Sequence, residues 1–430
     1  MMTDAPEIPE GLRPANENPW YILMTLYGEQ EGEEIDVELH KKNRRAWNAW
    51  VGQALSAEER VAAAKSSQIK VTELEAWDEL GEKIKARFFE ESNRRNVDTE
   101  GMLVFPEPAK PIWMGNTVFS ENLVFENMVI ASKVNFGSAN FMRNARFGFV
   151  TFAGVAVFGS AKFEQEAWFH FANFQKAALF GRARFKDFVY FFRARFGGCS
   201  GVRCLPSFAY CQFERPTIFS RALFCDGYPD FSGAVLHDKT SFTARMDPTS
   251  DEVAQDKDLE GRTFWPQRTK QDPVSARESC ATIRHLLTQQ GLPEEAHFFF
   301  RREMRFASQI GSFWQRLPYR SFGWLSDFGY SIQRPLWWLA GICFLGMAAF
   351  WTVFSFPGGP PVLSESDLGT AAALSFSNLF PLFGFGRVFL SEVLASLPRW
   401  AQVLSGAQTV LSLPLLFFLG LALRQRFRLR

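Results

Sequence analysis

The sequence predicts a mixed fold: an α-helical N-terminal region, a solenoid of short stacked strands, a helical hairpin, and two transmembrane helices with a re-entrant loop between them. Three observations predict this order. Phenylalanine accounts for 47 of the 430 residues, and its copies recur at a fixed interval in the middle of the chain. Two long stretches near the C-terminus carry no charge. The segment between them is apolar but is interrupted by proline and glycine.

The N-terminal region, residues 1–112, has a composition unlike the rest of the chain. Its stretch "NPWYILMTLYG" predicts a short apolar strand, whereas "LHKKNRRAWNAWVGQAL" and "TELEAWDELGEKIKARFFEES" predict amphipathic helices. Because the open end of a solenoid exposes apolar rings and unpaired backbone, we interpret this region as a cap. A separate ligand-binding module is the alternative. The acidic start of the chain has no apolar core, so we expect no signal peptide.

The solenoid is predicted for residues 113–246 from the spacing of its phenylalanines, which alternates between five and six residues and so repeats every eleven. These rings, the expected core, are Phe136, Phe141, Phe147, Phe152, Phe158, Phe163, Phe169, Phe174, Phe180, Phe185, Phe191 and Phe196. The interval fits neither a helix nor a long strand, but it fits short strands joined by tight corners. An alanine often stands two positions before the ring, on the same inward face.

Units such as "ANFMRN ARFGF", "AKFEQE AWFHF" and "ANFQKA ALFGR" resemble those of the pentapeptide-repeat family, over roughly residues 117–246. The resemblance blurs at "GGCSGVRCLPS" and resumes at Phe213. It implies a right-handed, four-sided β-helix with two eleven-residue units, hence 22 residues, in each coil. Phe163 would then stack between Phe141 and Phe185. The rings explain the fold and assign no chemistry.

Outward positions of the solenoid would meet a partner. Some members of the family mimic DNA with an acidic surface, but residues 117–246 contain fifteen Lys or Arg and nine Asp or Glu. This balance speaks against a DNA mimic. Basic side chains such as Arg182, Arg184, Arg193 and Arg195 could bind nucleic acid or anionic lipid, but a scattered basic face is more often only solvated. We therefore expect no nucleic-acid partner.

A charged linker is expected at residues 247–271 and a helical hairpin with an interfacial segment at 272–333. Asp272 and Pro273 mark the start of the first helix, and Gly291 marks its end. The following stretch, "GSFWQRLPYRSFGWLSDFGYSIQR", mixes aromatic rings with arginine. That mixture suits a membrane interface, where rings lie at the level of the headgroups and arginines meet phosphates.

The membrane domain is expected at residues 334–430. The 22 residues from Pro335 to Phe356 carry no charge and are long enough to cross the roughly 30 Å hydrocarbon layer. A second uncharged run, about Trp400 to Leu423, ends in "RQRFRLR". Basic flanks on both runs predict cytoplasmic N- and C-termini and a multi-pass protein of the bacterial inner membrane. A buried helix pair in a soluble protein is the alternative.

The loop at residues 367–390, "DLGTAAALSFSNLFPLFGFGRVFL", is too apolar for an ordinary surface connection. A half-length helix followed by non-helical backbone is tolerated at membrane depth only where protein or a water-filled cavity covers it. The arrangement resembles two-span pore-loop channels, with "AAALSFSNL" as pore helix and "LFGFG" as filter. The residues that this resemblance assigns to a pore or filter are Ser377, Leu382, Phe383, Gly384, Phe385, Gly386 and Arg387.

The loop departs from the pattern of a potassium channel at two positions. Such a filter has threonine where this chain has Leu382, and an acidic residue where it has Arg387. The threonine supplies a coordinating oxygen and the acid attracts cations, so potassium selectivity is not supported. A non-conducting hairpin stays open as an alternative to a pore.

Two functions fit the sequence. The first is an oligomeric two-span pore-loop channel, a homo-oligomer and by resemblance a tetramer, with a cytoplasmic β-helix that senses or scaffolds. The second is a non-conducting, membrane-anchored binding scaffold. Expected partners are membrane lipids, other copies of the chain and an unidentified cytoplasmic protein. We find no phosphate loop or catalytic constellation, and expect no enzyme activity and no cofactor. The six cysteines lack a CxxC pair, so reduced thiols are expected rather than a metal site or a disulfide.

Overall fold

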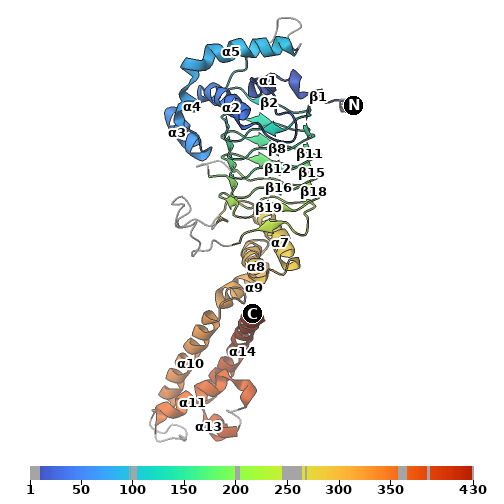
Figure 1. The fold of residues 1–430 in the computed structure, drawn as a ribbon. Helices are drawn as coiled ribbons and strands as arrows, with labels where there is room; N and C mark the ends of the chain where they lie inside the picture. Colours follow the sequence, from blue (N-terminus) through green and yellow to red (C-terminus); the bar gives the residue numbers. More distant parts are fainter. Residues whose placement is uncertain are drawn as a thin grey trace. The chain divides into compact units, whose positions relative to one another are not determined.

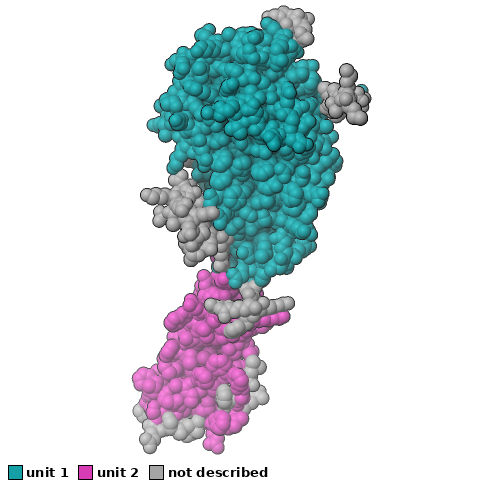
Figure 2. Space-filling model, in the orientation of Figure 1, with its two compact units in different colours: residues 1–303 teal, residues 304–430 magenta. Residues whose placement is uncertain are grey.

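The structure, a computed structural model, describes residues 10–95, 97, 104–198, 204–244, 264–266, 269–356, 366–384 and 388–428. The chain forms two compact units, residues 1–303 and 304–430 (Figure 2). The first contains the N-terminal helices, the β-helix and most of a helical hairpin. The second contains the long apolar helices. The order of elements in Figure 1 confirms the predicted mixed fold.

The β-helix consists of two- and three-residue strands stacked in four parallel sheets, one on each side. One sheet contains β1 (Arg13–Pro14), β3 (Thr117–Phe119), β7 (Asn140–Phe141), β11 (Lys162–Phe163), β15 (Arg184–Phe185) and β18 (Gln212–Phe213). Another contains β2 (Ile112–Trp113), β6 (Val134–Asn135), β10 (Ala156–Val157) and β14 (Ala178–Leu179).

The third sheet contains β4 (Leu123–Val124), β8 (Ala145–Arg146), β12 (Ala167–Trp168), β16 (Val189–Tyr190), β19 (Thr217–Phe219) and β21 (Ser241–Phe242). The fourth contains β5 (Val129–Ile130), β9 (Thr151–Phe152), β13 (Asn173–Phe174), β17 (Arg195–Phe196) and β20 (Leu223–Phe224). Lys162 pairs with Asn140 on one side and with Arg184 on the other, so one coil takes 22 residues.

The interior of the β-helix is a set of stacked phenylalanine columns. The ring of Phe163 lies between two others, its centroid 4.5 Å from that of Phe141 and 4.6 Å from that of Phe185. Parallel strands place equivalent side chains about 4.8 Å apart, which is a good distance for stacked rings. Alanines such as Ala161 and Ala183 are fully buried beside them and leave room for the rings. All twelve predicted core rings are buried.

One corner in each eleven-residue unit requires a left-handed residue. Asn116, Asn127, Ser138, Phe149, Ser160, Phe171, Arg182 and Arg193 have φ between 52° and 63°. The turn is closed by a backbone bond across it, as from Ala161 N to Phe158 O at 3.1 Å. Only one of the two corners in a unit has this conformation, which explains the alternation of five- and six-residue steps.

The repeat is interrupted once. Arg184 pairs with Gln212, 28 residues later, although the other sides of this coil keep their register. The extra residues coincide with the "GGCSGVRCLPS" stretch, where the sequence repeat is blurred. Beyond it, Phe213 stacks on Phe185 at 4.9 Å, so the ring column continues through the insertion.

The N-terminal region is helical and covers the first coil. Its helices are η1 (Ala15–Glu17), α1 (Pro19–Met24), α2 (Val37–Gly52), α3 (Ala57–Ser66), α4 (Val71–Glu75) and α5 (Trp77–Arg94). Tyr21 packs on Phe119 with 5.6 Å between centroids. Trp47 donates its indole N–H to Val129 O at 2.8 Å. These contacts, together with the pairing of β1 with β3, close the end of the solenoid as a cap must.

The strand predicted for "NPWYILMTLYG" is wrong, because this segment contains helix α1. Asn18 accepts a hydrogen bond from Trp20 N at 3.0 Å and Pro19 occupies the first turn, so the segment has its own helix start. The residues from Tyr21 to Met24 are buried on all sides. A short run that is apolar on every face has no period that could separate helix from strand.

The other end of the β-helix meets the predicted hairpin of α7 (Pro273–Gln289) and α8 (Pro293–Ala307). Asp272 caps α7 by accepting from Ser275 N at 3.1 Å, and Gly291 takes φ 72° in the turn. Trp265 stacks on Phe224 at 4.6 Å and meets Phe299 of α8 edge-on at 4.8 Å. The last rings of the column are therefore covered as well.

The second unit contains α9 (Phe313–Ser326), α10 (Gln333–Phe354), α11 (Asp367–Leu379), η2 (Pro381–Phe383), α13 (Ser391–Ser396) and α14 (Arg399–Arg428). Two of its helices, Gln333–Phe354 and the Arg399–Gln425 part of α14, are long and apolar enough to cross a membrane. At 1.5 Å per residue, a 22-residue helix spans about 33 Å. Little of either helix is buried within the described part of the chain.

Candidate functional site

Helix α11, the predicted pore helix, packs along both long helices, α10 and α14. Near its start, Ala371 and Leu374 pack with Phe350 of α10 and Ala401 of α14. At its end, Leu379 packs with Leu339 and Leu415. Helix α11 therefore runs from the C-terminal end of α10 past the middle of that helix.

The chain then returns to the end from which it came. Leu390, Val393 and Leu397, which follow α11 in sequence, rejoin the cluster that contains Phe350 and Ala371. Figure 1 shows α11 and α13 at the same end of the α10 and α14 pair. The segment from Ser366 to Leu397 thus enters and leaves at one end of the two long helices.

A cluster of buried polar side chains holds α11 in place. Asn378 donates to Gln408 Oε1 at 3.0 Å, and Ser405 donates to Asn378 Oδ1 at 3.0 Å. Gln408 Nε2 donates to Ser375 Oγ at 2.6 Å, and Ser375 Oγ donates to Cys343 O at 2.8 Å. The cluster links α10, α11 and α14 through bonds whose groups would otherwise be unsatisfied among apolar neighbours.

A glycine on α10 makes room for this cluster. A Cβ atom at Gly346 would lie 2.5 Å from Gln408 Nε2 and 2.7 Å from Ser375 Oγ. Both distances are far below a normal contact. Glycine at this position therefore allows the three helices to approach closely enough for the polar side chains to meet.

The residues that the sequence assigns to a pore are only partly described. Ser377 is buried beside Asn378 within its own subunit. Phe383 is 68% exposed, and Gly384 takes φ 68°, a left-handed conformation that suits glycine. Leu382 lies in η2, but its side chain is outside the described part. Phe385, Gly386 and Arg387 also lie outside the described residues.

The face of α11 that points away from α10 and α14 is apolar. Leu368 is 48% exposed, Phe376 is 52% exposed, and Phe383 continues the same line beyond the helix. The polar residues of α11, Ser375 and Asn378, point instead into the subunit. The sequence analysis selected Ser377 and missed both of them. Their signal was the presence of amide and hydroxyl groups inside runs without charge.

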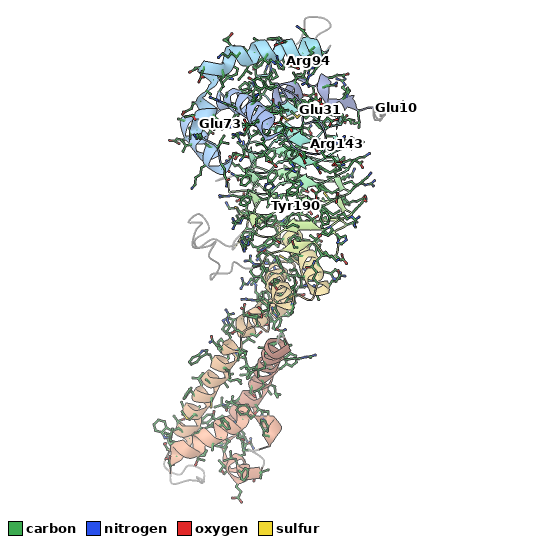
Figure 3. All side chains as sticks on the ribbon, viewed as in Figure 1. Glu10, Glu31, Glu73, Arg94, Arg143 and Tyr190 are labelled. Carbon is green, nitrogen blue, oxygen red and sulfur yellow. The ribbon has the colours of Figure 1, made fainter. Side chains whose placement is uncertain are left out.

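The outer surface of the β-helix uses its basic side chains locally. Arg193 lies over the rings of Phe171 and Phe192, at 5.4 and 5.6 Å from their centroids. Arg184 donates to Gln212 Oε1 at 2.8 Å. Figure 3 shows Arg143 and Tyr190 among the side chains that cover this part of the molecule. Arginine over aromatic rings stabilises the coils, which favours a structural role for this face.

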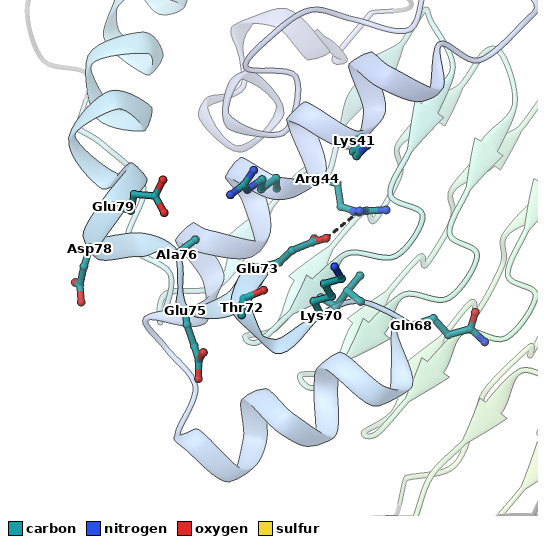
Figure 4. A pocket seen from close by; sticks show the side chains of 12 residues that line it. Lys41, Arg44, Gln68, Lys70, Thr72, Glu73, Glu75, Ala76, Asp78 and Glu79 are labelled. Carbon is teal, nitrogen blue, oxygen red and sulfur yellow. Dashed lines mark hydrogen bonds and ion pairs between the residues drawn. The ribbon is translucent and has the colours of Figure 1, made fainter.

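An open groove of about 730 Å³ lies beside α2 and α4 in the N-terminal cap (Figure 4). Its lining carries both signs of charge, with Lys41 and Lys70 against Glu75 and Asp78. Arg44 and Glu73 form an ion pair of 2.9 Å across it. The charges compensate one another within the chain, so the groove does not select a ligand by charge.

His40, near this groove, is a buried neutral histidine. Its Nε2 lies 2.9 Å from Glu126 O, a contact between α2 and the β-helix. Burial lowers its pKa to about 4, and the neighbouring Arg44 lowers the pKa further, against the raising effect of the bond to Glu126. The side chain therefore belongs to the interface between cap and solenoid.

Among the described residues, no group of three His, Cys, Asp or Glu side chains is placed to hold a metal ion. Comparison with known proteins gives no further assignment. No family model matches the chain, and no curated protein and no solved structure matches it either.

Proposed function

We propose that the protein is an oligomeric membrane protein in which the segment from Ser366 to Leu397, containing α11, contributes to an ion pathway. The observation that carries the proposal is the course of α11. It runs along α10 and α14 and the chain then returns to the same end of them. In a membrane this would be a re-entrant loop, the arrangement on which pore-loop channels are built.

The need for other copies follows from the solvent. Lipid cannot hydrogen-bond to the non-helical backbone that follows Leu379, so protein or water must cover it. In one chain α10 and α14 cover part of α11, and Leu368, Phe376 and Phe383 stay exposed. Another copy packed on this apolar face would complete the cover. The resemblance to pore-loop channels suggests four copies.

The distribution of charge gives the proposed orientation. Arg334 precedes the apolar part of α10, and Arg424 follows that of α14, so basic residues stand at the same end of the antiparallel pair. Basic residues concentrate on the cytoplasmic side of membrane proteins. Both termini, and with them the β-helix, would lie in the cytoplasm of a bacterium. There the β-helix would act as a sensing or scaffolding module.

One observation favours the second candidate, a non-conducting membrane-anchored scaffold. The polar groups of α11 bond within the subunit, to Ser405 and Gln408. The face left for a pathway is formed by leucine and phenylalanine. A hairpin of this kind could serve only to anchor the β-helix.

Ion flux through the purified full chain in liposomes separates the two functions. We expect flux above that of empty vesicles, and we expect Arg387→Asp to raise the permeability to cations relative to anions, because a ring of positive charge disfavours cations. Arg424→Asp, at the opposite end of the membrane unit, is the matched control and should leave the ratio unchanged. Flux equal to that of empty vesicles would leave the scaffold as the function.

A further inference from the structure

Helix α9, which precedes the first long helix, exposes an unusual number of large apolar side chains. Trp314 is 76% exposed and Trp324 is 62% exposed, and Phe313 and Leu317 are exposed as well. At 100° per residue these four side chains fall on one side of the helix. The helix therefore carries an apolar stripe, formed by Phe313, Trp314, Leu317 and Trp324, that no described residue covers.

The opposite side of α9 is fixed to the long helices. Phe322 packs on Phe418 of α14 with 5.3 Å between ring centroids. Leu325 joins the cluster of Leu339 and Leu415. Arg334 Nη1, at the start of α10, donates to Gly323 O at 2.9 Å and so satisfies a carbonyl in the last turn of α9. The helix is thus held at a set height beside the beginning of α10.

Two arginines border the apolar stripe. Among the described residues, the side chains of Arg316 and Arg320 have no carboxylate partner, and Arg316 Nε has no hydrogen-bond acceptor. The one acidic residue between positions 308 and 332 is Asp327, and it lies 3.5 Å from Arg305. The free positive charges and the rings thus occur together on one helix.

We infer that α9 is a binding site for anionic phospholipid, with Arg316 and Arg320 on the headgroup phosphates and the apolar stripe at the boundary with the acyl chains. Charge complementarity supports this occupant. Continuity supports it too, because α10 begins at Gln333 and its second turn exposes Trp337 by 77%. An amphipathic helix beside a membrane-spanning helix lies in the plane of the interface. The inference does not depend on ion conduction.

The test uses the full chain in lipid nanodiscs, with its six cysteines replaced and one new cysteine carrying an environment-sensitive fluorophore. The site is introduced by Leu317→Cys on the apolar stripe or by Tyr319→Cys on the opposite side. We expect an apolar emission from the probe at 317 and a water-like emission from the probe at 319. Water-like emission from both, in every lipid, would overturn the inference.

Lipid selection is measured with the same probe at 317. Nitroxide-labelled phosphatidylglycerol should quench it several-fold more than nitroxide-labelled phosphatidylcholine, because each arginine near the surface favours anionic lipid. The double variant R316Q/R320Q should lose this preference, and R143Q/R184Q on the β-helix should keep it. Equal quenching by both lipids in the unaltered protein, or a preference that survives R316Q/R320Q, would contradict the assignment.

Discussion

Phe163 shows at the scale of one residue how the β-helix is stabilised. Its ring contacts the rings of the coils above and below, and its neighbour Lys162 points outward. Phe163→Ala should lower the free energy of unfolding by about 3 to 5 kcal/mol, the usual loss for a buried ring. Lys162→Ala should cost little. Denaturant unfolding of both variants in detergent, followed by circular dichroism, checks this, and equal losses would contradict the column.

His40 makes the stability of the cap dependent on pH. Its pKa is about 4 in the folded chain against 6.5 without burial. The unfolded chain therefore binds a proton at a pH where the folded chain does not. The stabilising contribution is complete above pH 6.5 and is lost as the pH falls toward 4. The total effect is about 3 kcal/mol.

The measurement compares unfolding at several pH values for the unaltered chain and for His40→Gln, which retains an N–H near Glu126 O but cannot titrate. The variant should lose stability less steeply on acidification. His285→Gln, at an exposed histidine, is the control. Burial raises the pKa of Glu126, which acts in the opposite direction. An identical slope for all three proteins would show that His40 is not a buried neutral group.

At the scale of elements, the β-helix could be predicted from sequence and α1 could not. The coils repeat, so an eleven-residue period in phenylalanine is visible even though each strand has only two or three residues. Helix α1 has six residues, occurs once and is buried on most sides. Its four apolar residues show no period, and only the capping pair of Asn18 and Pro19 indicated a helix.

The polar cluster of the membrane unit could not be predicted for a different reason. Ser375, Asn378 and Gln408 lie on two helices far apart in sequence, and their contact depends on how α11 docks. The charge-free runs indicated the long helices. They did not indicate which hydroxyl or amide side chains would face one another, because helix packing in apolar surroundings is set by shape and by small residues such as Gly346.

The cluster makes a prediction for α11. Gln408→Leu removes the partner of Ser375 and Asn378 and should cost about 1 to 3 kcal/mol, the penalty for unsatisfied buried groups. Cys343, whose carbonyl accepts from Ser375, should then react faster with a maleimide. Gln402→Leu, at an exposed position of α14, should change neither melting nor labelling. An unaltered melting point and labelling rate in Gln408→Leu would show that the cluster does not hold α11.

For the whole molecule, the distribution of charge predicts the topology. Both termini should lie in the cytoplasm, because basic residues flank the outer ends of both apolar helices. A reporter active only outside the cytoplasm should be silent when fused after Arg430 and active when inserted near Ser364. A reporter active at Arg430 and silent near Ser364 would reverse the orientation and would place the β-helix outside.

The central claim is that the segment containing α11 lines an ion pathway, and chemical block of that pathway tests it most directly. The full chain, with its native cysteines replaced and Phe383→Cys introduced, is reconstituted in liposomes and treated with a charged thiol reagent. We predict ion flux before treatment and none above empty vesicles after it. Val410→Cys, exposed on α14, is the control and should conduct before and after labelling. Flux that persists after Phe383→Cys is labelled, or no flux at all, would contradict the account.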